Sequence, residues 1–190
     1  MLDFSGVKSR TATFADITKD LTKTDLHRLT DEMIDTQLSI ISDAIDADAV
    51  LVPVDSNAND TFGKPEDKDL AWTLGHVVVH VTASSEESAA ISSVLARGLT
   101  MGDHDRSRYE TPWETVTTVA QLRQRLEESR RQRHAFLETW PDQPDLETTQ
   151  IRPYGTFNAV SRFVAGLYHD TDHLEQLREI MHQAHAANHK

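Results

Sequence analysis

The chain contains, near its C-terminus, the stretch Leu167-Tyr168-His169-Asp170-Thr171-Asp172-His173-Leu174-Glu175-Gln176. Apolar residues recur at three- and four-residue steps within and around this stretch, which is the period of one helix face. We expect the helix to run from about Phe157 to Ala186. His169 and His173 are four residues apart, so both imidazoles lie on one face, where two nitrogens can bind one ion.

Three other segments have the same helical period. They run from about Thr24 to Ala47, Thr73 to Leu99 and Val119 to Trp140. Thr24 or Asp25 can cap the first helix, Thr73 the second and Thr118 the third, because their side-chain oxygens accept hydrogen bonds from backbone amides. A short additional helix can form between Thr11 and Leu21. The run Val50–Val54 could pair as a strand, but no segment sustains a two-residue alternation.

Four amphipathic helices of this length predict an all-α fold, a four-helix bundle whose helices pack antiparallel. The segments between them are rich in Pro, Gly, Asp and Asn, which is typical of loops. These loops are long for a simple up-and-down bundle, so we expect a crossover connection. We expect residues 1–190 to form a single domain with its core at about 24–181, a short N-terminal extension and a polar C-terminal tail.

Composition excludes several classes of partner. The formal net charge is −12, and an acidic surface repels phosphate backbones, so we expect no nucleic-acid partner. No apolar run reaches the roughly 20 residues of a membrane helix, so we expect no membrane partner. The N-terminus lacks a basic segment followed by an apolar one, which argues against a signal peptide. There is no cysteine to form a disulfide, bind a metal or act as nucleophile, and we expect a cytoplasmic protein.

A second histidine pair, His76 and His80, lies on the expected helix from Thr73 to Leu99. The flanking sequence is strongly apolar, so at least one of the two imidazoles should point into the bundle, and periodicity does not decide which. A buried neutral imidazole needs partners for both nitrogens, and a metal ion with a nearby acceptor would satisfy both. The carboxylates that could orient the histidines are Glu86, Glu87, Asp170 and Asp172. The His-Glu-x-x-His pattern of zinc proteases is absent.

Other residues share the helix faces that carry the histidines. Gln176 could hydrogen-bond a ligand or a bound water. Gly166, one turn before His169, has no side chain and would leave room for an approaching group. Arg162 could anchor an anionic substrate group, although a solvated arginine is the simpler interpretation. Three further histidines lie in polar surroundings and are expected to be solvated: His27, His104 and His134.

The motif Trp72-Thr73-Leu74 followed by His80, together with the stretch from His169 to Gln176, resembles the DinB-like family. That family includes the YfiT-like metal-dependent hydrolases and the thiol-dependent S-transferases, and the resemblance extends from about Thr24 to Met181. It implies a four-helix bundle with a long crossover, in which one histidine of the second helix and two of the fourth hold a metal. Residue by residue, it implies His80, His169 and His173 as metal ligands, with His76 in reserve as a ligand or a neighbouring group.

Three histidine ligands leave at least one metal position for water or substrate, which is typical of a catalytic site. Imidazole ligands suit zinc or nickel, with iron as a further option. The metal could lower the pKa of a bound water, or bind and deprotonate a thiol carried by a small molecule. We therefore expect a thiol S-transferase or a hydrolase that acts on a small-molecule substrate, with a low-molecular-weight thiol as a partner. Gln176 and Glu87 would help to orient the nucleophile.

Two other functions are compatible with the same sequence. The chain could be a non-catalytic helical module that binds a metal or a small ligand, for instance in a stress response. Alternatively, the histidines could be ordinary core or surface residues of helices that assemble into a dimer. A homodimer is plausible for a bundle of this size, although the sequence names no interface.

Overall fold

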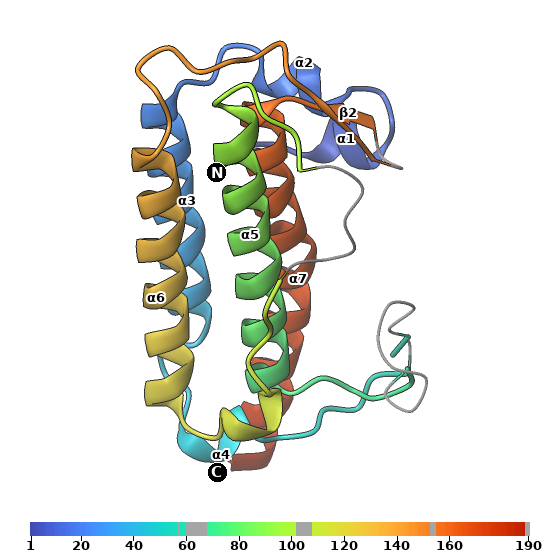
Figure 1. Cartoon of the computed structure of the whole chain (residues 1–190). Coiled ribbons are helices and arrows are strands. Elements are labelled where there is room, and N and C mark those ends of the chain that lie inside the picture. Colours follow the sequence, from blue (N-terminus) through green and yellow to red (C-terminus); the bar gives the residue numbers. More distant parts are fainter. Residues whose placement is uncertain (57, 60–67, 102–107, 153–154, 189–190) are drawn as a thin grey trace.

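Four long helices lie side by side in the computed structural model, which describes residues 1–56, 58–59, 68–101, 108–152 and 155–188 (Figure 1). They are α3 (Lys23–Ile40), α5 (Leu74–Leu95), α6 (Val119–Glu138) and α7 (Ala159–Asn188). The short elements are α1 (Ser5–Lys8), α2 (Phe14–Thr18), α4 (Asp46–Ala49), the 3-10 helix η2 (Trp113–Thr115) and the antiparallel strands β1 (Gln150–Arg152) and β2 (Gly155–Phe157). The expected all-α fold is confirmed.

The long helices are arranged as a square, in which α3 and α5 each contact both α6 and α7. α5 and α6 run parallel, since Arg97, just after α5, donates to the carbonyl oxygen of Thr139, just after α6. α6 therefore begins at the end of the bundle opposite to the one at which α5 ends, which confirms the crossover connection (Figure 1). α3 and α7 also run parallel, and Asn188 at the end of α7 donates to Asp48 in α4, shortly after α3. The expectation of an antiparallel bundle is wrong for these two pairs. α6 begins at the same end of the bundle as α5, and α7 begins at the same end as α3.

Three of the long helices begin at a threonine N-cap: Thr22 for α3, Thr73 for α5 and Thr118 for α6. The caps of α5 and α6 confirm the prediction, whereas α3 begins slightly earlier than expected. Asp25 does not cap α3 but completes a capping box, in which its carboxylate accepts a hydrogen bond from the Thr22 backbone. α3 ends at Ile40 and not near Ala47, because the chain turns and starts α4 at Asp46.

The short elements differ more from expectation. α2 lies within the interval where a short helix was predicted, but α1 was not foreseen. The run Val50–Val54 forms no strand. The hairpin of β1 and β2 lies instead shortly before α7, where Gln150 pairs with Phe157. Strands of three residues are too short to produce a recognisable two-residue period, so the sequence could not reveal them.

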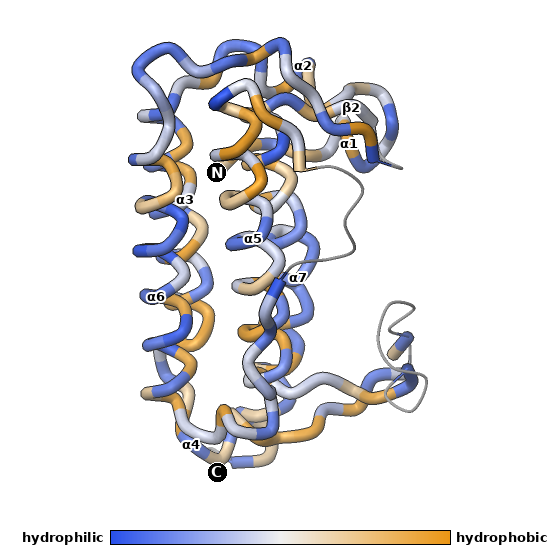
Figure 2. The backbone as a smooth tube through the Cα atoms, viewed as in Figure 1, coloured by the Kyte–Doolittle hydropathy of each residue, from blue (hydrophilic) through white to orange (hydrophobic). Residues whose placement is uncertain are grey.

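The core fills the space among the long helices. Its fully buried leucines come from all four of them and include Leu26, Leu74, Leu122, Leu126 and Leu177. Removing one such side chain from water contributes about 1.5–3 kcal/mol. Figure 2 shows hydrophobic segments interleaved with hydrophilic ones along the helices, as the three- to four-residue period predicted. Apolar burial therefore holds the bundle together, and polar groups inside it need a separate explanation.

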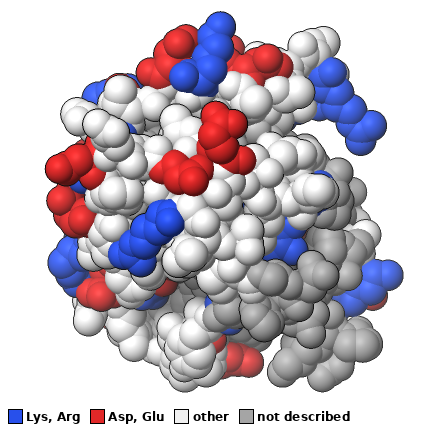
Figure 3. All heavy atoms as spheres, turned by 45° about the horizontal axis from the view of Figure 1, so that its top comes forward, with Lys and Arg blue, Asp and Glu red and all other residues white. Residues whose placement is uncertain are grey.

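The surface carries both signs of charge. On the face drawn in Figure 3, acidic and basic side chains are intermingled, and the described residues form no large continuous basic patch there. Opposite charges also bridge neighbouring helices, as in the ion pair of Arg130 on α6 with Asp35 on α3. Among the described residues, no helix has the length and hydropathy of a membrane span.

Candidate metal centre

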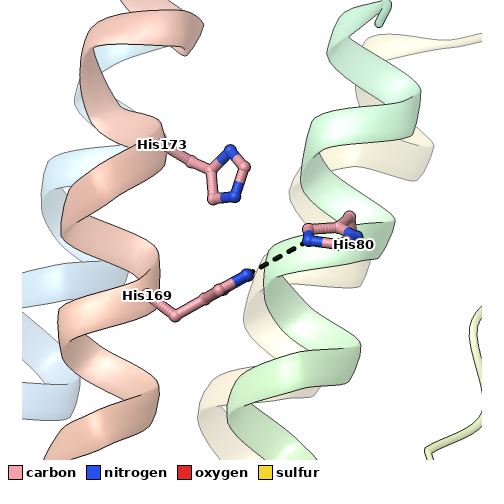
Figure 4. Close-up of side chains that lie close together, drawn as sticks. All are labelled: His80, His169 and His173. Carbon is pink, nitrogen blue, oxygen red and sulfur yellow. Dashed lines mark hydrogen bonds between the residues drawn. The ribbon is translucent and has the colours of Figure 1, made fainter. Parts of the chain in front are cut away.

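Three histidines meet in the space between α5 and α7 (Figure 4). His80 projects from α5, and His169 and His173 project from successive turns of α7, with the rings directed toward one another. One ring nitrogen of each lies within 4.8 Å of those of the other two, and His80 Nε2 is 3.1 Å from His169 Nε2. Two nitrogens bound at about 2.1 Å to one ion lie about 3 to 3.5 Å apart. The cluster therefore has the spacing of a metal-ligand set, although metal binding itself stays a prediction.

A close approach of α5 and α7 brings His80 within reach of the other two rings. A Cβ atom at Gly166 would lie 2.9 Å from Ser88 Cβ and 3.1 Å from Ser85 Cα, so only glycine fits between the helices at this turn. Gly166 was expected to leave room for something to approach, and the neighbouring helix takes this room. Its missing side chain makes room for the backbone of α5.

A buried ion pair fixes α5, α6 and α7 relative to one another beside the histidines. Arg133 of α6 and Asp170 of α7 are 1% and 0% exposed, and their charged groups are 2.6 Å apart. Asp170 also accepts a hydrogen bond of 2.7 Å from Ser85 Oγ of α5. Burial raises the pKa of Asp170, and the charge of Arg133 opposes that shift. Because Asp170 directly follows His169, these contacts also fix the rotation of α7 at the histidine face.

Gln176 orients His173. Its Oε1 accepts a hydrogen bond of 2.8 Å from His173 Nδ1, and a neutral imidazole that donates from Nδ1 keeps the Nε2 lone pair for a metal. Burial lowers the pKa of His173, which favours the neutral ring. Gln176 was expected to hydrogen-bond either a ligand or a bound water. In the structure its partner is His173, a candidate metal ligand. A catalytic role for Gln176 stays a prediction.

His76 lies outside the cluster of His80, His169 and His173 and has a different environment. Its ring is stacked between Trp72, at 4.3 Å between centroids, and Trp113, at 4.9 Å. The far face of Trp72 continues the stack toward His173, whose ring is 5.8 Å away and tilted by only 12°. The question left open by periodicity is therefore answered by the fold: His80, and not His76, faces the histidines of α7.

The four carboxylates expected to orient the histidines have other partners or positions. Glu86 pairs with Arg125, Asp170 with Arg133, and Asp172 with Lys8. A carboxylate of the crossover, Glu110, lies close to His80 instead, with its Oε1 3.7 Å from His80 Nδ1. Arg108 lies beside both, with its Nη2 2.9 Å from Glu110 Oε2 and 3.4 Å from His80 Nδ1.

Sequence reasoning missed Arg108 and Glu110 because both belong to the crossover, where no helical period indicates which side chains point inward. Their only signal is a pair of opposite charges two residues apart in a loop. Burial alone would raise the pKa of Glu110, but the proximity of His80 and the charge of Arg108 lower it below its usual value. Glu110 is therefore a carboxylate that stays charged beside the histidine cluster.

Glu87 lies seven residues beyond His80, about 10 Å farther along α5. It lines a cavity of about 360 Å³ between α5, α6 and the crossover, whose other polar residues are Glu86, Arg108, Tyr109, Thr111, Arg125 and Gln132. The structure thus does not bring Glu87 into the group of three histidines, and a catalytic role for it stays a prediction. Arg108 borders both the cavity and the cluster.

Arg162 is largely enclosed between α7, α5 and β1. Its guanidinium donates to Ser88 Oγ at 2.7 Å and to Gln150 Oε1 at 3.2 Å. Burial lowers the pKa of Arg162 to about 10, while the charge of Glu87 opposes this shift. The interpretation of Arg162 as a solvated side chain is therefore wrong, and the arginine lies where α7 contacts α5, two turns before His169.

Two of the remaining histidines form a pair elsewhere in the bundle. The rings of His27 on α3 and His134 on α6 lie 4.6 Å apart, and they pair with Glu138 and Asp31 respectively. Both are partly buried, so the expectation that they are solvated holds only in part. His104 lies outside the described residues.

Comparison with known proteins gives one result that bears on the cluster. A family model described as the DinB superfamily matches residues 14–177, a span that contains all four long helices up to Leu177 and the three clustered histidines. Neither a search of curated proteins nor a search of solved structures gave a match.

Proposed function

The chain belongs to the DinB superfamily, and from that premise we propose that it is a metal-dependent enzyme whose ion is held by His80, His169 and His173. The convergence of these three rings between α5 and α7 carries the proposal. Imidazole nitrogens are suitable ligands for zinc and nickel, and iron is a further option. Three protein ligands leave a position for a reacting group, unlike the four ligands of a closed structural site.

The surroundings of the histidines fit such an ion. Gln176 accepts from His173 Nδ1 and so directs the Nε2 lone pair toward the other two rings. Trp72 closes one side of the cluster, with its ring centroid 4.6 Å from that of His80. The ion pair of Arg133 with Asp170 holds the helices that supply the ligands. The chain therefore provides both a donor set and a rigid frame for it.

A divalent ion bound here would supply Lewis acidity, which stabilises the deprotonated form of a water or a thiol at neutral pH. The residues of the chain would position the substrate beside it. Arg162 offers a positive charge about two turns from His169, suited to an anionic group of the substrate. Glu87 offers the opposite charge next to it. A small molecule with both kinds of group matches this side of the site.

Thiol transfer is the better supported of the two reactions. Hydrolysis usually requires a carboxylate or a free imidazole as general base beside the attacking water. In the part of the chain that the structure describes, the ligand group contains three histidines and no carboxylate, and the nearby Glu110 faces His80 Nδ1, whereas His80 Nε2 faces the cluster. A thiol supplied by a small molecule needs no such base, because its sulfur is acidic enough to bind as thiolate. We therefore propose an S-transferase that uses a low-molecular-weight thiol.

The test is a measurement of metal content by elemental mass spectrometry on protein purified without an affinity tag. We expect close to one zinc or nickel ion per chain, lost in His80→Ala and in His173→Ala. His27→Ala is the matched control, since it removes a histidine from the α3–α6 pair and should leave the metal content unchanged. Consumption of an electrophile with each of several small thiols would then be followed with the metal-loaded protein.

Two results separate this proposal from the alternative of a non-catalytic metal- or ligand-binding module. Metal-dependent loss of the thiol and the electrophile, abolished in His173→Ala, supports the enzyme. A stoichiometric metal without turnover of any thiol supports the binding module. No metal after incubation with zinc and nickel contradicts the metal-dependent enzyme and leaves a module that binds another ligand.

A further inference from the structure

We infer that Glu110, on the crossover between α5 and α6, selects the tautomer of His80 and thereby raises the metal affinity of the three-histidine site. This inference rests on the proposed metal site. It starts from the environment of His80 Nδ1, which faces two groups of opposite charge: Glu110 Oε1 at 3.7 Å and Arg108 Nη2 at 3.4 Å. His173 differs in this respect, because its Nδ1 is hydrogen-bonded to the neutral side chain of Gln176.

A neutral imidazole at His80 can form a hydrogen bond through Nδ1 with only one of its two neighbours at a time, Arg108 or Glu110. The ring carries one proton, so one nitrogen donates and the other accepts. His80 Nε2 is the nitrogen that faces the cluster, at 3.1 Å from His169 Nε2. It can bind a metal only when the proton is on Nδ1. Nδ1–H then needs an acceptor, and Glu110 can accept whereas the guanidinium of Arg108 can only donate.

Two hydrogen-bond chains are therefore open to His80. In the first, Arg108 donates to Nδ1, and Nε2–H donates to His169 Nε2, which occupies the lone pairs that a metal would need. In the second, Nδ1–H donates to Glu110, and Nε2 presents its lone pair to the metal. Conversion moves one proton from Nε2 to Nδ1 through solvent and changes no net charge. Metal binding thus favours the second hydrogen-bond arrangement. By the same linkage, a group that stabilises the second arrangement must raise the affinity for the metal.

The crossover controls this choice because it carries both competitors. Arg108 and Glu110 form an ion pair of 2.9 Å, so the two competitors lie together beside the same ring nitrogen. Arg108 also donates to Ser84 on α5 and borders the cavity between α5 and α6. A displacement of Arg108 toward that cavity would leave Glu110 as the partner of Nδ1. Glu110 is in this sense a positioning residue, since it acts on the metal through His80.

The experiment measures zinc affinity by competition with a chromophoric chelator. We expect Glu110→Ala to weaken zinc binding by about 10- to 100-fold, the usual effect of removing a carboxylate behind a histidine ligand. Glu110→Gln should lose less, because its amide oxygen still accepts from Nδ1. Arg108→Met should bind zinc more tightly than the wild type, since it removes the competing donor. Glu114→Gln, an equal change of charge at an exposed position of the same segment, should leave the affinity unchanged.

A second readout follows the tautomer directly. Long-range ¹H–¹⁵N spectra of His80 should show the proton on Nδ1 in the zinc-loaded protein, and the Nδ1–H form should gain population in Arg108→Met before zinc is added. Equal affinities of Glu110→Ala and wild type, or equal losses in Glu110→Ala and Glu110→Gln, would overturn this inference and leave the metal site standing. A wild type that binds neither zinc nor nickel would remove the proposed function and this inference together. Thermal unfolding of each variant verifies that it is folded.

Discussion

Gly166 on α7 lies so close to Ser88 on α5 that a Cβ atom at position 166 would be 2.9 Å from Ser88 Cβ. This contact sets the separation of the two helices that carry the histidines. It also explains a small residue at a position where an amphipathic helix would otherwise bury a larger one. The geometry of the candidate metal centre therefore depends on a residue that contacts no ligand.

Gly166→Ala should push α5 and α7 apart. The new methyl group would meet Ser88 Cβ and the backbone of Ser85 at 3.1 Å, and such overpacking costs about 1–3 kcal/mol. Zinc affinity should fall together with the free energy of unfolding, since His80 moves away from α7. Adding Ser88→Gly should restore part of both quantities, because it removes the nearer of the two clashes. Urea unfolding and zinc competition measure them, and unchanged values in Gly166→Ala would contradict this account of the packing.

Asp170→Asn should be strongly destabilising. It leaves the charge of Arg133 buried without its counter-ion, and breaking a buried pair in this way costs about 3–5 kcal/mol. Asp172→Asn is the matched control, since Asp172 pairs with Lys8 at the surface and its loss should change the free energy of unfolding by well under about 1 kcal/mol. Chemical denaturation of both variants decides the point. Equal stabilities would mean that the Arg133–Asp170 pair does not hold the bundle.

His76→Phe should retain the metal, because a phenyl ring can take the place of the imidazole between Trp72 and Trp113. His80→Phe should lose it, because His80 supplies a ligand nitrogen. The two variants make the same chemical change four residues apart on one helix, so each is the control for the other. Metal loss in His76→Phe with retention in His80→Phe would reverse the assignment of the two histidines.

Zinc should raise the stability of the protein, and a chelator should reverse the gain. An ion that binds only the folded chain adds about 2.7 kcal/mol to the free energy of unfolding when its concentration is 100 times its dissociation constant. The effect should be absent in His169→Ala and His173→Ala, and present in His134→Ala. Thermal unfolding with and without zinc measures it. An equal shift in all of these proteins would indicate binding elsewhere.

Metal binding should also change the fluorescence of Trp72, one of three tryptophans in the chain. Its ring lies 4.6 Å from that of His80 and 5.8 Å from that of His173, so nickel or copper bound to them should quench its emission. Trp72→Phe should remove most of the response, whereas Trp140→Phe, which alters a core tryptophan, should preserve it. A full response in Trp72→Phe would place the metal outside the cluster.

Helix period and caps allowed much of this architecture to be predicted. The caps Thr73 and Thr118 and the four-residue spacing of His169 and His173 depend on neighbours along the chain, and such signals are visible in sequence. The parallel arrangement of α5 and α6 could not be predicted, because it depends on the path of a long loop. The same holds for Gly166, whose neighbour is 78 positions away in Ser88, and for Glu110, whose contact with His80 depends on the crossover.

Around the candidate metal site, too, some residues could be found from the sequence and others only from the structure. The resemblance to the DinB-like family supplied His80, His169 and His173, and the fold brings them together. Glu86 and Asp172 were reasonable candidates by proximity in sequence, but Arg125 and Lys8 pair with them. Which carboxylate stands behind a histidine is decided by tertiary contacts, and only the structure contains these.

The most direct measurement of the central claim is X-ray absorption on the zinc-loaded protein, which counts the imidazoles bound to the ion. The account predicts three imidazole nitrogens at about 2.0–2.1 Å with one oxygen ligand from solvent or one sulfur ligand from an added thiol, and two imidazoles in His80→Ala. A spectrum with oxygen ligands only, or with the same number of imidazoles in His80→Ala as in the wild type, would contradict a metal centre formed by His80, His169 and His173.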